Sequence, residues 1–337
     1  MFKIRILSRD DVAKSLTMSQ IIETVENVYK SKSEGSAIVW PTVFYEFDPG
    51  KSDMDIKSGY LKNAGRFGHK TVSWFGANEA KGLPTLIGTL VIYDASTGAP
   101  VGVMDASYIT GMRTGAAGAI GAKYLARGGS ENLLMVGAGN QAIFQIAATL
   151  TVFPGIKKVM VAARDFAKTG GFVKNLAARL AGEFRLDVSR VSFEAVSGLK
   201  GAVGNSDIII TATNSTSPVI KKEWVKAGAH FSCIGADMPG KEEIDPEIFA
   251  SARVFADDKE HCMDVGEMAI PLKKGIIKEK DITGEMGDLL LGQVRGRVDD
   301  KDITIFDSTG MAILDIASGG IALQQAAAHG FGSEVMI

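Results

Sequence analysis

The sequence predicts an α/β protein with two parts, a doubly wound parallel sheet and an α+β region. From about residue 132 onward, short apolar runs typical of strands alternate with helical segments. Such alternation gives a parallel sheet covered by helices. The length of 337 residues also exceeds that of one typical domain.

The N-terminal part combines a helix with several strands. A helix is expected over 17–33, where Thr17 and Gln20 form a capping box at its start. β-Rich runs between 38 and 104 indicate an antiparallel sheet packed on helices. A helix rich in glycine and alanine follows at 113–127, and its small residues permit the close approach of another backbone.

The second part contains the expected parallel strands. They are 133–136, 159–162, 191–194, 207–211, 230–234 and 253–256. Helices are expected between most of them, for example over 166–180 and 244–250. A last strand and turn at 303–310 precede a closing helix that ends at Gly330, and we expect this helix to return to the N-terminal part.

The composition argues against several classes of protein. A formal charge of −2 disfavours nucleic acid or an anionic membrane as partner. Cys233 and Cys262 show no disulfide or metal-ligand spacing, so neither a disulfide framework nor a metal site is expected. No apolar run reaches the ~18 residues of a membrane helix, and the first residues lack the apolar core of a signal peptide. We therefore expect a cytoplasmic protein.

The stretch "NLLMVGAGNQAIFQIAA" (132–148) has the layout of a dinucleotide-binding turn. Gly137 makes the tight turn after a strand, Gly139 leaves room for a pyrophosphate, and Ala142 allows close helix–strand packing. The helix that starts near Asn140 directs its free N–H groups at the phosphates. An ordinary glycine turn is the alternative, but strand, turn and helix in this order favour a Rossmann cofactor site.

The end of the next strand, "VMVAARD", bears on the choice of cofactor. NAD-specific sites place an acid there for the ribose 2′-hydroxyl, whereas a nearby arginine accommodates the 2′-phosphate of NADP. Ala163 takes the position of the acid and Arg164 follows it, which favours NADP(H). A shift of two residues would make Asp165 the ribose acid, so NAD(H) stays possible.

The fifth strand ends in "CIGADMPGKEEIDP". Ligands of doubly wound folds sit outside the carboxyl ends of the strands, so Asp237 and Lys241 fall at the rim of the expected cleft. A carboxylate there can exchange a proton with an amine, an imine or water during hydride transfer. A capping role in the turn before Pro239 and Gly240 is the alternative.

Seven motifs resemble the ornithine cyclodeaminase/mu-crystallin family, in its order and spacing from about residue 40 onward. They read "HKTVSW", "GLPTLIG", "VGVMDASYITGMRTGAAGAIGAKYLAR", "VGAGNQA", "TATNS", "GADMPGKEE" and "IFDSTGMAILD". The resemblance implies a homodimer, a Rossmann domain at 114–310, and a discontinuous substrate-binding and dimerisation domain made of 1–113 and 311–337. It also implies that the substrate is an L-amino acid or its imine.

The resemblance implies roles for single residues as well. Lys70 resembles the lysine that holds the substrate carboxylate, and Asp237 resembles the catalytic aspartate, so both are expected in catalysis. Arg113 resembles the arginine near the cofactor phosphates, with an ion pair to Asp105 as the structural alternative. Further cofactor contacts are expected at Thr85, Thr114, Asn140, Gln141, Ala163, Arg164, Asp165, Thr213, Lys241 and Ser308, besides Gly137 and Gly139.

One departure from the family pattern concerns the substrate carboxylate. The segment "IVWPTVFYEF" contains no arginine where many members carry one. Lys57 and Ser58 in "MDIKSGYL" offer an alternative grip, similar to the branch that includes iminosuccinate reductases, and Arg66 is another candidate cation. A merely solvated Lys57 is the structural alternative.

Together these features predict an NAD(P)-dependent oxidoreductase that interconverts an L-amino acid and its imine or keto acid, with an alanine- or aspartate-like substrate. Two alternatives stay open. An ornithine cyclodeaminase would use NAD catalytically to make proline and ammonia from ornithine. A protein like mu-crystallin would bind NADP and a small ligand without turnover, although the presence of Asp237 and Lys70 argues against this.

Overall fold

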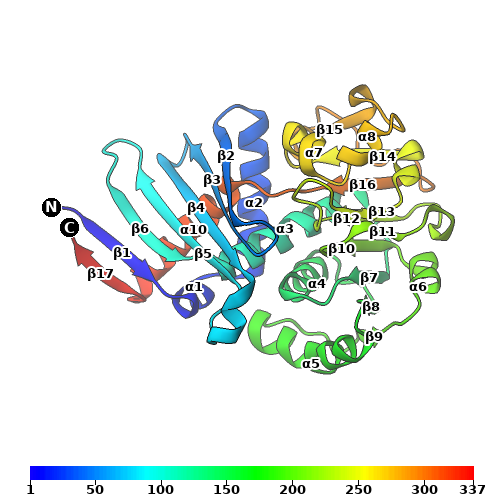
Figure 1. Cartoon of the computed structure of the whole chain (residues 1–337), viewed down its shortest axis with the longest axis horizontal. Helices are drawn as coiled ribbons and strands as arrows, with labels where there is room; N and C mark the ends of the chain where they lie inside the picture. Colours follow the sequence, from blue (N-terminus) through cyan, green and yellow to red (C-terminus); the bar gives the residue numbers. More distant parts are fainter. The chain divides into compact units, whose positions relative to one another are not determined.

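The computed structural model describes residues 1–337, which form two compact units (Figure 1). The first unit consists of Met1–Arg113 and Met311–Ile337, and the second of Thr114–Gly310. The division lies inside helix α3 (Ser107–Leu125), so this one helix belongs to both units.

The second unit is built on an eight-stranded sheet in which every neighbouring pair of strands is parallel. Its order is β15-β14-β16-β12-β10-β7-β8-β9. The strands are β7 (Asn132–Val136), β8 (Lys158–Ala162), β9 (Ser192–Ala195), β10 (Ile208–Thr211), β12 (His230–Cys233), β14 (Ala252–Ala256), β15 (Ile282–Glu285) and β16 (Ile303–Asp307). The first of them, β7, lies between β8 and β10. The strand order therefore reverses at β7, and ligands of doubly wound sheets bind at such a switch point. The predicted fold class is confirmed.

The remaining elements of the second unit are α-helices, 3₁₀ segments and one small sheet. The α-helices are α4 (Asn140–Val152), α5 (Phe166–Phe184), α6 (Leu199–Asn205), α7 (Lys259–Val265), α8 (Ala269–Lys273) and α9 (Met286–Leu290). The 3₁₀ segments are η2 (Lys222–Trp224), η3 (Pro246–Ser251) and η4 (Glu279–Asp281). Strands β11 (Thr216–Ile220) and β13 (Glu242–Ile244) pair in parallel as a separate two-stranded sheet.

The prediction of a helix at 244–250 is wrong in the type of helix and in its first residue. Ile244 is the last residue of β13 and pairs with Ile220. The following turn is the 3₁₀ segment η3, which begins at Pro246 after the Asp245 side chain accepts the Glu247 N–H. A proline fits the first position of a helical turn because it has no N–H to leave unpaired there.

The first unit is a seven-stranded, mostly antiparallel sheet in the order β17-β1-β6-β5-β4-β3-β2. Only β1 and β6 are parallel. The strands are β1 (Lys3–Leu7), β2 (Ala37–Asp48), β3 (Ser52–Leu61), β4 (Arg66–Phe75), β5 (Leu86–Asp94), β6 (Pro100–Asp105) and β17 (Ser333–Met336). The helices are α1 (Arg9–Ser15), α2 (Met18–Ser33), the 3₁₀ segment η1 (Gly76–Lys81) and α10 (Ala312–His329).

Helix α10 covers one face of this sheet, and glycines allow the close approach. A Cβ on Gly319 of α10 would lie 2.6 Å from Leu90 and 2.8 Å from Ile92, both on β5. A Cβ on Gly59 of β3 would lie 2.7 Å from Ile313 of α10. We call this side of the sheet the helix face and the opposite side the outer face.

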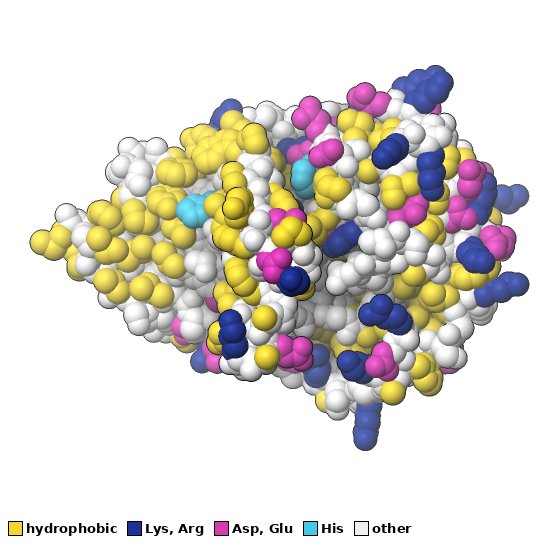
Figure 2. Space-filling model, viewed as in Figure 1, with side chains coloured by type: hydrophobic (Ala, Val, Ile, Leu, Met, Phe, Trp, Pro, Cys, Tyr) yellow, Lys and Arg dark blue, Asp and Glu magenta, His cyan; other side chains and the backbone are white.

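The outer face is apolar although nothing within the first unit covers it. Side chains alternate between the faces of a strand, and the register places Trp40, Phe67, Val91 and Tyr93 together on the outer face. Phe67 and Tyr93 stack with their ring centroids 4.9 Å apart. Figure 2 shows hydrophobic side chains gathered over the strands of this unit. A contiguous apolar surface of this kind marks an interaction site.

Candidate active site

A buried ionic cluster on the helix face of the first unit consists of Lys70, Arg113 and Asp315. Strand β4 supplies Lys70, helix α3 supplies Arg113, and helix α10 supplies Asp315. One oxygen, Asp315 Oδ1, accepts from Lys70 Nζ (3.1 Å) and from Arg113 Nε (3.2 Å). The side chains are 3%, 7% and 0% exposed, so the three charges are removed from water together.

The cluster has more positive charge than its single carboxylate neutralises. Burial, together with the charge of Arg113, lowers the pKa of Lys70 to about 8 against the attraction of Asp315. Burial also opposes the charge of Asp315, but Arg113 and Lys70 outweigh it and hold the pKa of this carboxyl below its usual value. An uncompensated buried cation is costly, so a second anion would be stabilised here.

Donors suited to such an anion are also present. Lys70 uses one N–H for Asp315 and another for Thr110 Oγ1 at 3.3 Å, so its third remains. Arg113 reaches Asp315 through Nε, so its two terminal Nη groups are not used in that contact. A planar guanidinium edge and an ammonium are the donors that recognise carboxylates.

Asp315 is a member of this cluster that the sequence did not single out. Arg113 was expected near cofactor phosphates, with Asp105 as the alternative partner; the structure pairs it with Asp315 instead. Asp105 accepts the Ser107 N–H at 3.0 Å at the start of α3. A signal was present, since Asp315 is the only charged residue in the apolar stretch "MAILDIASGGIAL".

The register of β3 and β4 separates the other candidate substrate residues. Lys57 lies directly opposite Lys70, so both side chains point to the helix face. Ser58 lies opposite His69 and therefore points to the outer face, away from Lys70. The two residues of the predicted Lys–Ser grip are thus on opposite faces of the sheet.

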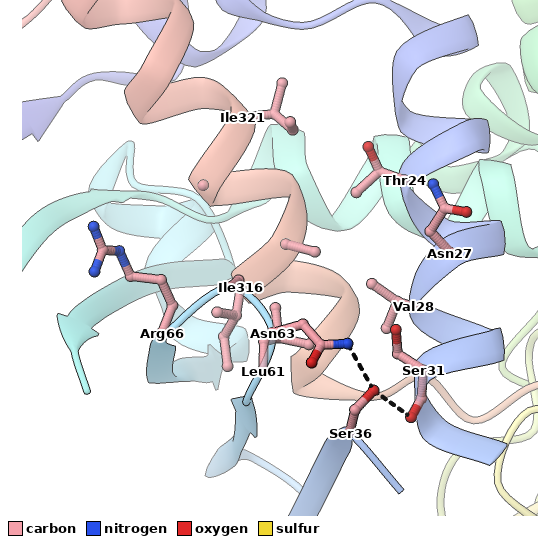
Figure 3. A pocket seen from close by; sticks show the side chains of 13 residues that line it. Thr24, Asn27, Val28, Ser31, Ser36, Leu61, Asn63, Arg66, Ile316 and Ile321 are labelled. Atoms are coloured by element: carbon pink, nitrogen blue, oxygen red, sulfur yellow. Dashed lines mark hydrogen bonds between the residues drawn. The ribbon is translucent and has the colours of Figure 1, made fainter. Parts of the chain in front are cut away.

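Arg66 is engaged elsewhere in the first unit. It forms an ion pair with Asp94 and lines a cavity of about 390 Å³ between α2, the β3–β4 turn and α10 (Figure 3). Lys70 and Arg113 are not among the residues lining this cavity. Thr85, expected to contact the cofactor, precedes β5, and its carbonyl accepts the Phe75 N–H at 2.8 Å.

In the second unit, the glycine turn has the geometry that a pyrophosphate requires. Gly137 has a φ of +113°, and a Cβ there would lie 2.4 Å from the Ala212 carbonyl oxygen. A Cβ on Gly139 would meet nothing within 4 Å, so open space lies beside it. Gly139 is the N-cap of α4, so no capping side chain covers the start of this helix, where N–H groups and the helix dipole favour an anion. These residues fit a dinucleotide.

The end of β8 places the three residues that bear on cofactor choice. Ala163 directly follows the strand, and Arg164 is exposed and forms no ion pair. Asp165 is the N-cap of α5 and accepts the Lys168 N–H at 3.0 Å. One oxygen of its carboxylate, Oδ1, is therefore used by the helix.

The loop after β12 carries Asp237. Its Oδ1 lies 2.6 Å from Lys241 Nζ, and the Asp237 side chain is 45% exposed. This ion pair replaces the turn-capping role considered as an alternative. In the loop after β10, the Thr213 N–H donates to Glu243 Oε1 at 2.6 Å.

Two further predicted cofactor residues have buried hydroxyls. Ser308 follows β16 and donates to Asp257 Oδ2 at 2.8 Å, and the same oxygen accepts the Gly310 N–H. Thr114 lies in α3; its Oγ1 is buried without a hydrogen-bond partner, while its carbonyl accepts from Gln145 at 2.9 Å. An unpaired buried hydroxyl is rare and is satisfied when a ligand supplies the partner.

The chain belongs to the ornithine cyclodeaminase/mu-crystallin family, whose model matches residues 3–327. It is 35% identical to the alanine dehydrogenase of Archaeoglobus fulgidus over 98% of this chain and 97% of that protein. The expected family membership is confirmed. No helix of the structure has the length and apolar character needed to cross a membrane.

Three solved structures share the fold over nearly their whole length, each with a TM-score of 0.91. An archaeal alanine dehydrogenase dimer with bound NAD is 35% identical and covers 100% of both chains. The Δ1-pyrroline-2-carboxylate reductase of Thermococcus litoralis, in complex with NADH and L-proline, is 31% identical and covers 98% of this chain and 100% of its own. The iminosuccinate reductase of Paracoccus denitrificans, in complex with NAD⁺, is 29% identical and covers 100% of both.

Proposed function

We propose that this protein interconverts an L-amino acid and its imine, with a nicotinamide dinucleotide as the hydride donor or acceptor. The observation that carries the proposal is the Lys70–Arg113–Asp315 cluster, which has an excess of positive charge and unused donors for a carboxylate. The Gly137 turn supports the cofactor. Relatives named as an alanine dehydrogenase and as imine reductases support the reaction class.

Each residue has one task in this proposal. Lys70, with Lys57 opposite it, holds the substrate carboxylate and so fixes the position of the Cα. When bound, the cofactor supplies or accepts the hydride at that carbon. Asp237, directly or through water, gives a proton to the nitrogen during reduction and takes one during oxidation. Lys241 holds the Asp237 carboxylate in place.

The reaction is tested with the purified protein and a panel of substrates. Pyruvate or oxaloacetate with ammonia, and a cyclic imino acid, should each be offered with NADH and with NADPH. Net loss of reduced nicotinamide absorbance supports the proposal. Formation of proline and ammonia from ornithine with only catalytic NAD would make the protein a cyclodeaminase. Binding of NADP(H) without turnover of any substrate would leave the ligand-binding alternative.

For the cofactor, we propose a preference for NADP(H) over NAD(H). Arg164 is exposed without an ion pair at the end of β8, and Asp165 is committed to capping α5. An arginine is suited to a 2′-phosphate, and a charge-assisted contact of this kind is worth about 1.5–3 kcal/mol. Arg164→Met should therefore lower kcat/KM with NADPH about tenfold or more and leave that with NADH unchanged. Equal effects on both cofactors would contradict the preference.

For the assembly, we propose a homodimer that buries the outer face of the first unit's sheet. On this face, Val43 and Tyr45 of β2 lie opposite Ile56 and Met54 and are more than half exposed in the single chain. The archaeal alanine dehydrogenase of the same fold is a dimer. An uncovered apolar sheet face is the kind of surface that a second copy removes from water.

A further inference from the structure

The loops that follow β10 and β12 are joined by one buried side chain, Glu243. Its Oε1 accepts the Thr213 N–H at 2.6 Å, and its Oε2 accepts the Gly235 N–H at 2.9 Å. Glu243 is fully buried in β13, and β10 and β12 are neighbouring strands of the main sheet. Both carboxylate oxygens therefore bind backbone beyond the carboxyl ends of these two strands.

The backbone packs directly on this carboxylate. A Cβ on Gly235 would lie 2.5 Å from Glu243 Oε1 and 2.5 Å from the Thr213 carbonyl oxygen. Only glycine leaves room for so close an approach. Asp237 stands two residues after Gly235, and the contact of its own carboxylate is with Lys241 on the same loop. The hydrogen bond from Gly235 to Glu243 is thus, in sequence, the contact nearest to Asp237 that joins this loop to the loop carrying Thr213.

The surroundings of Glu243 make a charged carboxylate energetically costly. Two more buried carboxyl groups, Glu267 and Asp307, lie nearby, and no ion pair joins any of the three to a cation. Burial raises the pKa of Glu243 and, together with the Glu243 charge, that of Glu267. Burial raises the pKa of Asp307 to about 8. Asp257, Cys233 and Cys262 also face this group. Hydrogen bonds from backbone N–H groups and from the Thr211 and Thr213 side chains, rather than cations, offset the burial of the Glu243 carboxylate.

The two glutamates differ in how they use their oxygens. Glu267 Oε1 accepts both the Glu243 N–H (2.8 Å) and the Ile244 N–H (2.7 Å), whereas its buried Oε2 has no partner. A protonated Glu267, or a glutamine in its place, keeps every one of these bonds. Glu243 needs both oxygens as acceptors, so an amide in its place leaves one loop N–H unpaired.

We propose that Glu243 is a positioning residue that fixes the loop carrying Asp237 against the loop carrying Thr213. The inference rests on the proposed function, in which Asp237 transfers the proton. A carboxylate with two acceptor oxygens sets the spacing of two backbone N–H groups more firmly than either loop does alone. A misplacement of about 1 Å at a reacting group is enough to cost about 100-fold in rate.

Kinetics of Glu243→Gln test the proposal, with Glu267→Gln as the matched control. The Glu243 variant should lose 10- to 100-fold in kcat, with the imino-acid KM within twofold of wild type, because Lys70 and Lys57 are untouched. Glu267→Gln carries the same chemical change in the same buried group and should retain wild-type kcat. Equal losses in both variants, or no loss in Glu243→Gln, would overturn the proposal.

A double-mutant cycle with Asp237→Asn separates positioning from general stability. If Glu243 acts through Asp237, the added Glu243→Gln change lowers kcat of Asp237→Asn less than twofold. Additive losses contradict the proposal. Full kcat in Asp237→Asn alone contradicts the role of Asp237 in the proposed function instead, and the exchange measurement below then decides on Glu243 separately.

Amide hydrogen exchange of the wild-type protein tests the link without any variant. Thr213 and Gly235 lie in loops outside the β10 and β12 strands, yet their N–H groups are bonded to a buried carboxylate. We expect both amides to exchange as slowly as those of the adjacent strands. Exchange as fast as at the exposed Met238 would overturn the proposal. This result stands even if Glu243→Gln does not fold.

Discussion

In the proposed function, affinity for the substrate carboxylate depends most directly on Lys70. Lys70→Met should lower kcat/KM for the imino acid about 10- to 100-fold, since a hydrogen bond to a charged group is worth about 1.5–3 kcal/mol. Asp315 keeps Arg113 as its partner, so the variant should still fold. Affinity for NADPH, measured by fluorescence titration, should stay unchanged. Lys51→Met, at a lysine that is 75% exposed, is the control.

The charge of Lys70 also predicts a pH dependence. Its pKa of about 8 in the folded protein lies below the 10.5 of a free lysine, so the ammonium is lost as pH rises through 8. kcat/KM for the imino acid should therefore fall above pH 8, and this fall should be absent in Lys70→Met. The free energy of unfolding changes in the opposite direction. Between pH 8 and 10.5 the unfolded chain binds more protons at this lysine than the folded protein does, so the free energy of unfolding rises with pH. Urea titrations at pH 8 and 10 measure this.

Single residues of the site were predictable only where a motif carried them. Lys70 and Lys57 were found from "HKTVSW" and "KSG", and the register places them opposite one another. Asp315 and Glu243 also stand in motifs seen in the sequence, yet the contacts of Asp315 are with residues far along the chain, and those of Glu243 include the backbone of two loops. Asp315 and Lys70 are 245 residues apart, and a buried carboxylate cannot be distinguished from a surface one by residue type.

At the scale of elements, the turn between β7 and α4 makes a prediction that separates folding from binding. Gly137→Ala should lower unfolding free energy by at least about 2 kcal/mol, because φ is +113° and the added Cβ meets the Ala212 oxygen. Gly139→Ala should leave the Tm of the ligand-free protein unchanged, because open space surrounds the new methyl. It should still weaken NADPH binding about tenfold or more. Thermal unfolding and fluorescence titration measure the two effects, and a matching loss of Tm in both variants would contradict them.

The central strands of the second unit were predictable because they are buried on both faces and read as continuous apolar runs, whereas the edge strand β15, in which only Ile282 is buried, was not expected. Ile208, Ile209 and Ile210, for example, are 0% exposed. Strand β3 was not among the β-rich runs that indicated the sheet, since its helix-face positions include Asp53, Asp55 and Lys57, while Met54, Ile56 and Tyr60 point to the outer face. These inward-facing charged residues hide the alternation of apolar and polar residues by which a strand with one buried face is usually predicted. The short strands β1 and β17 were also not predicted, because they pair with each other although they lie at opposite ends of the chain.

At the scale of the whole molecule, the outer face predicts the state of association. Light scattering should give twice the 35.7 kDa mass of the chain. Val43→Glu, on the exposed part of β2, should shift the protein to the mass of one chain, because a carboxylate in an apolar contact is costly. Val298→Glu, at a valine that is 59% exposed in the second unit, should not. A monomeric wild-type protein would contradict the proposed dimer.

The division of the chain inside α3 has a consequence for synthesis on the ribosome. The second unit is one uninterrupted segment, Thr114–Gly310, and is complete before the last helix emerges. The first unit cannot be completed until then, because α10 brings the carboxylate that pairs with Lys70 and Arg113. Since domains fold as units during translation, the middle segment of the chain can complete its fold before the first unit does. Until residue 315 leaves the exit tunnel, the nascent first unit holds two cations that have no counterion.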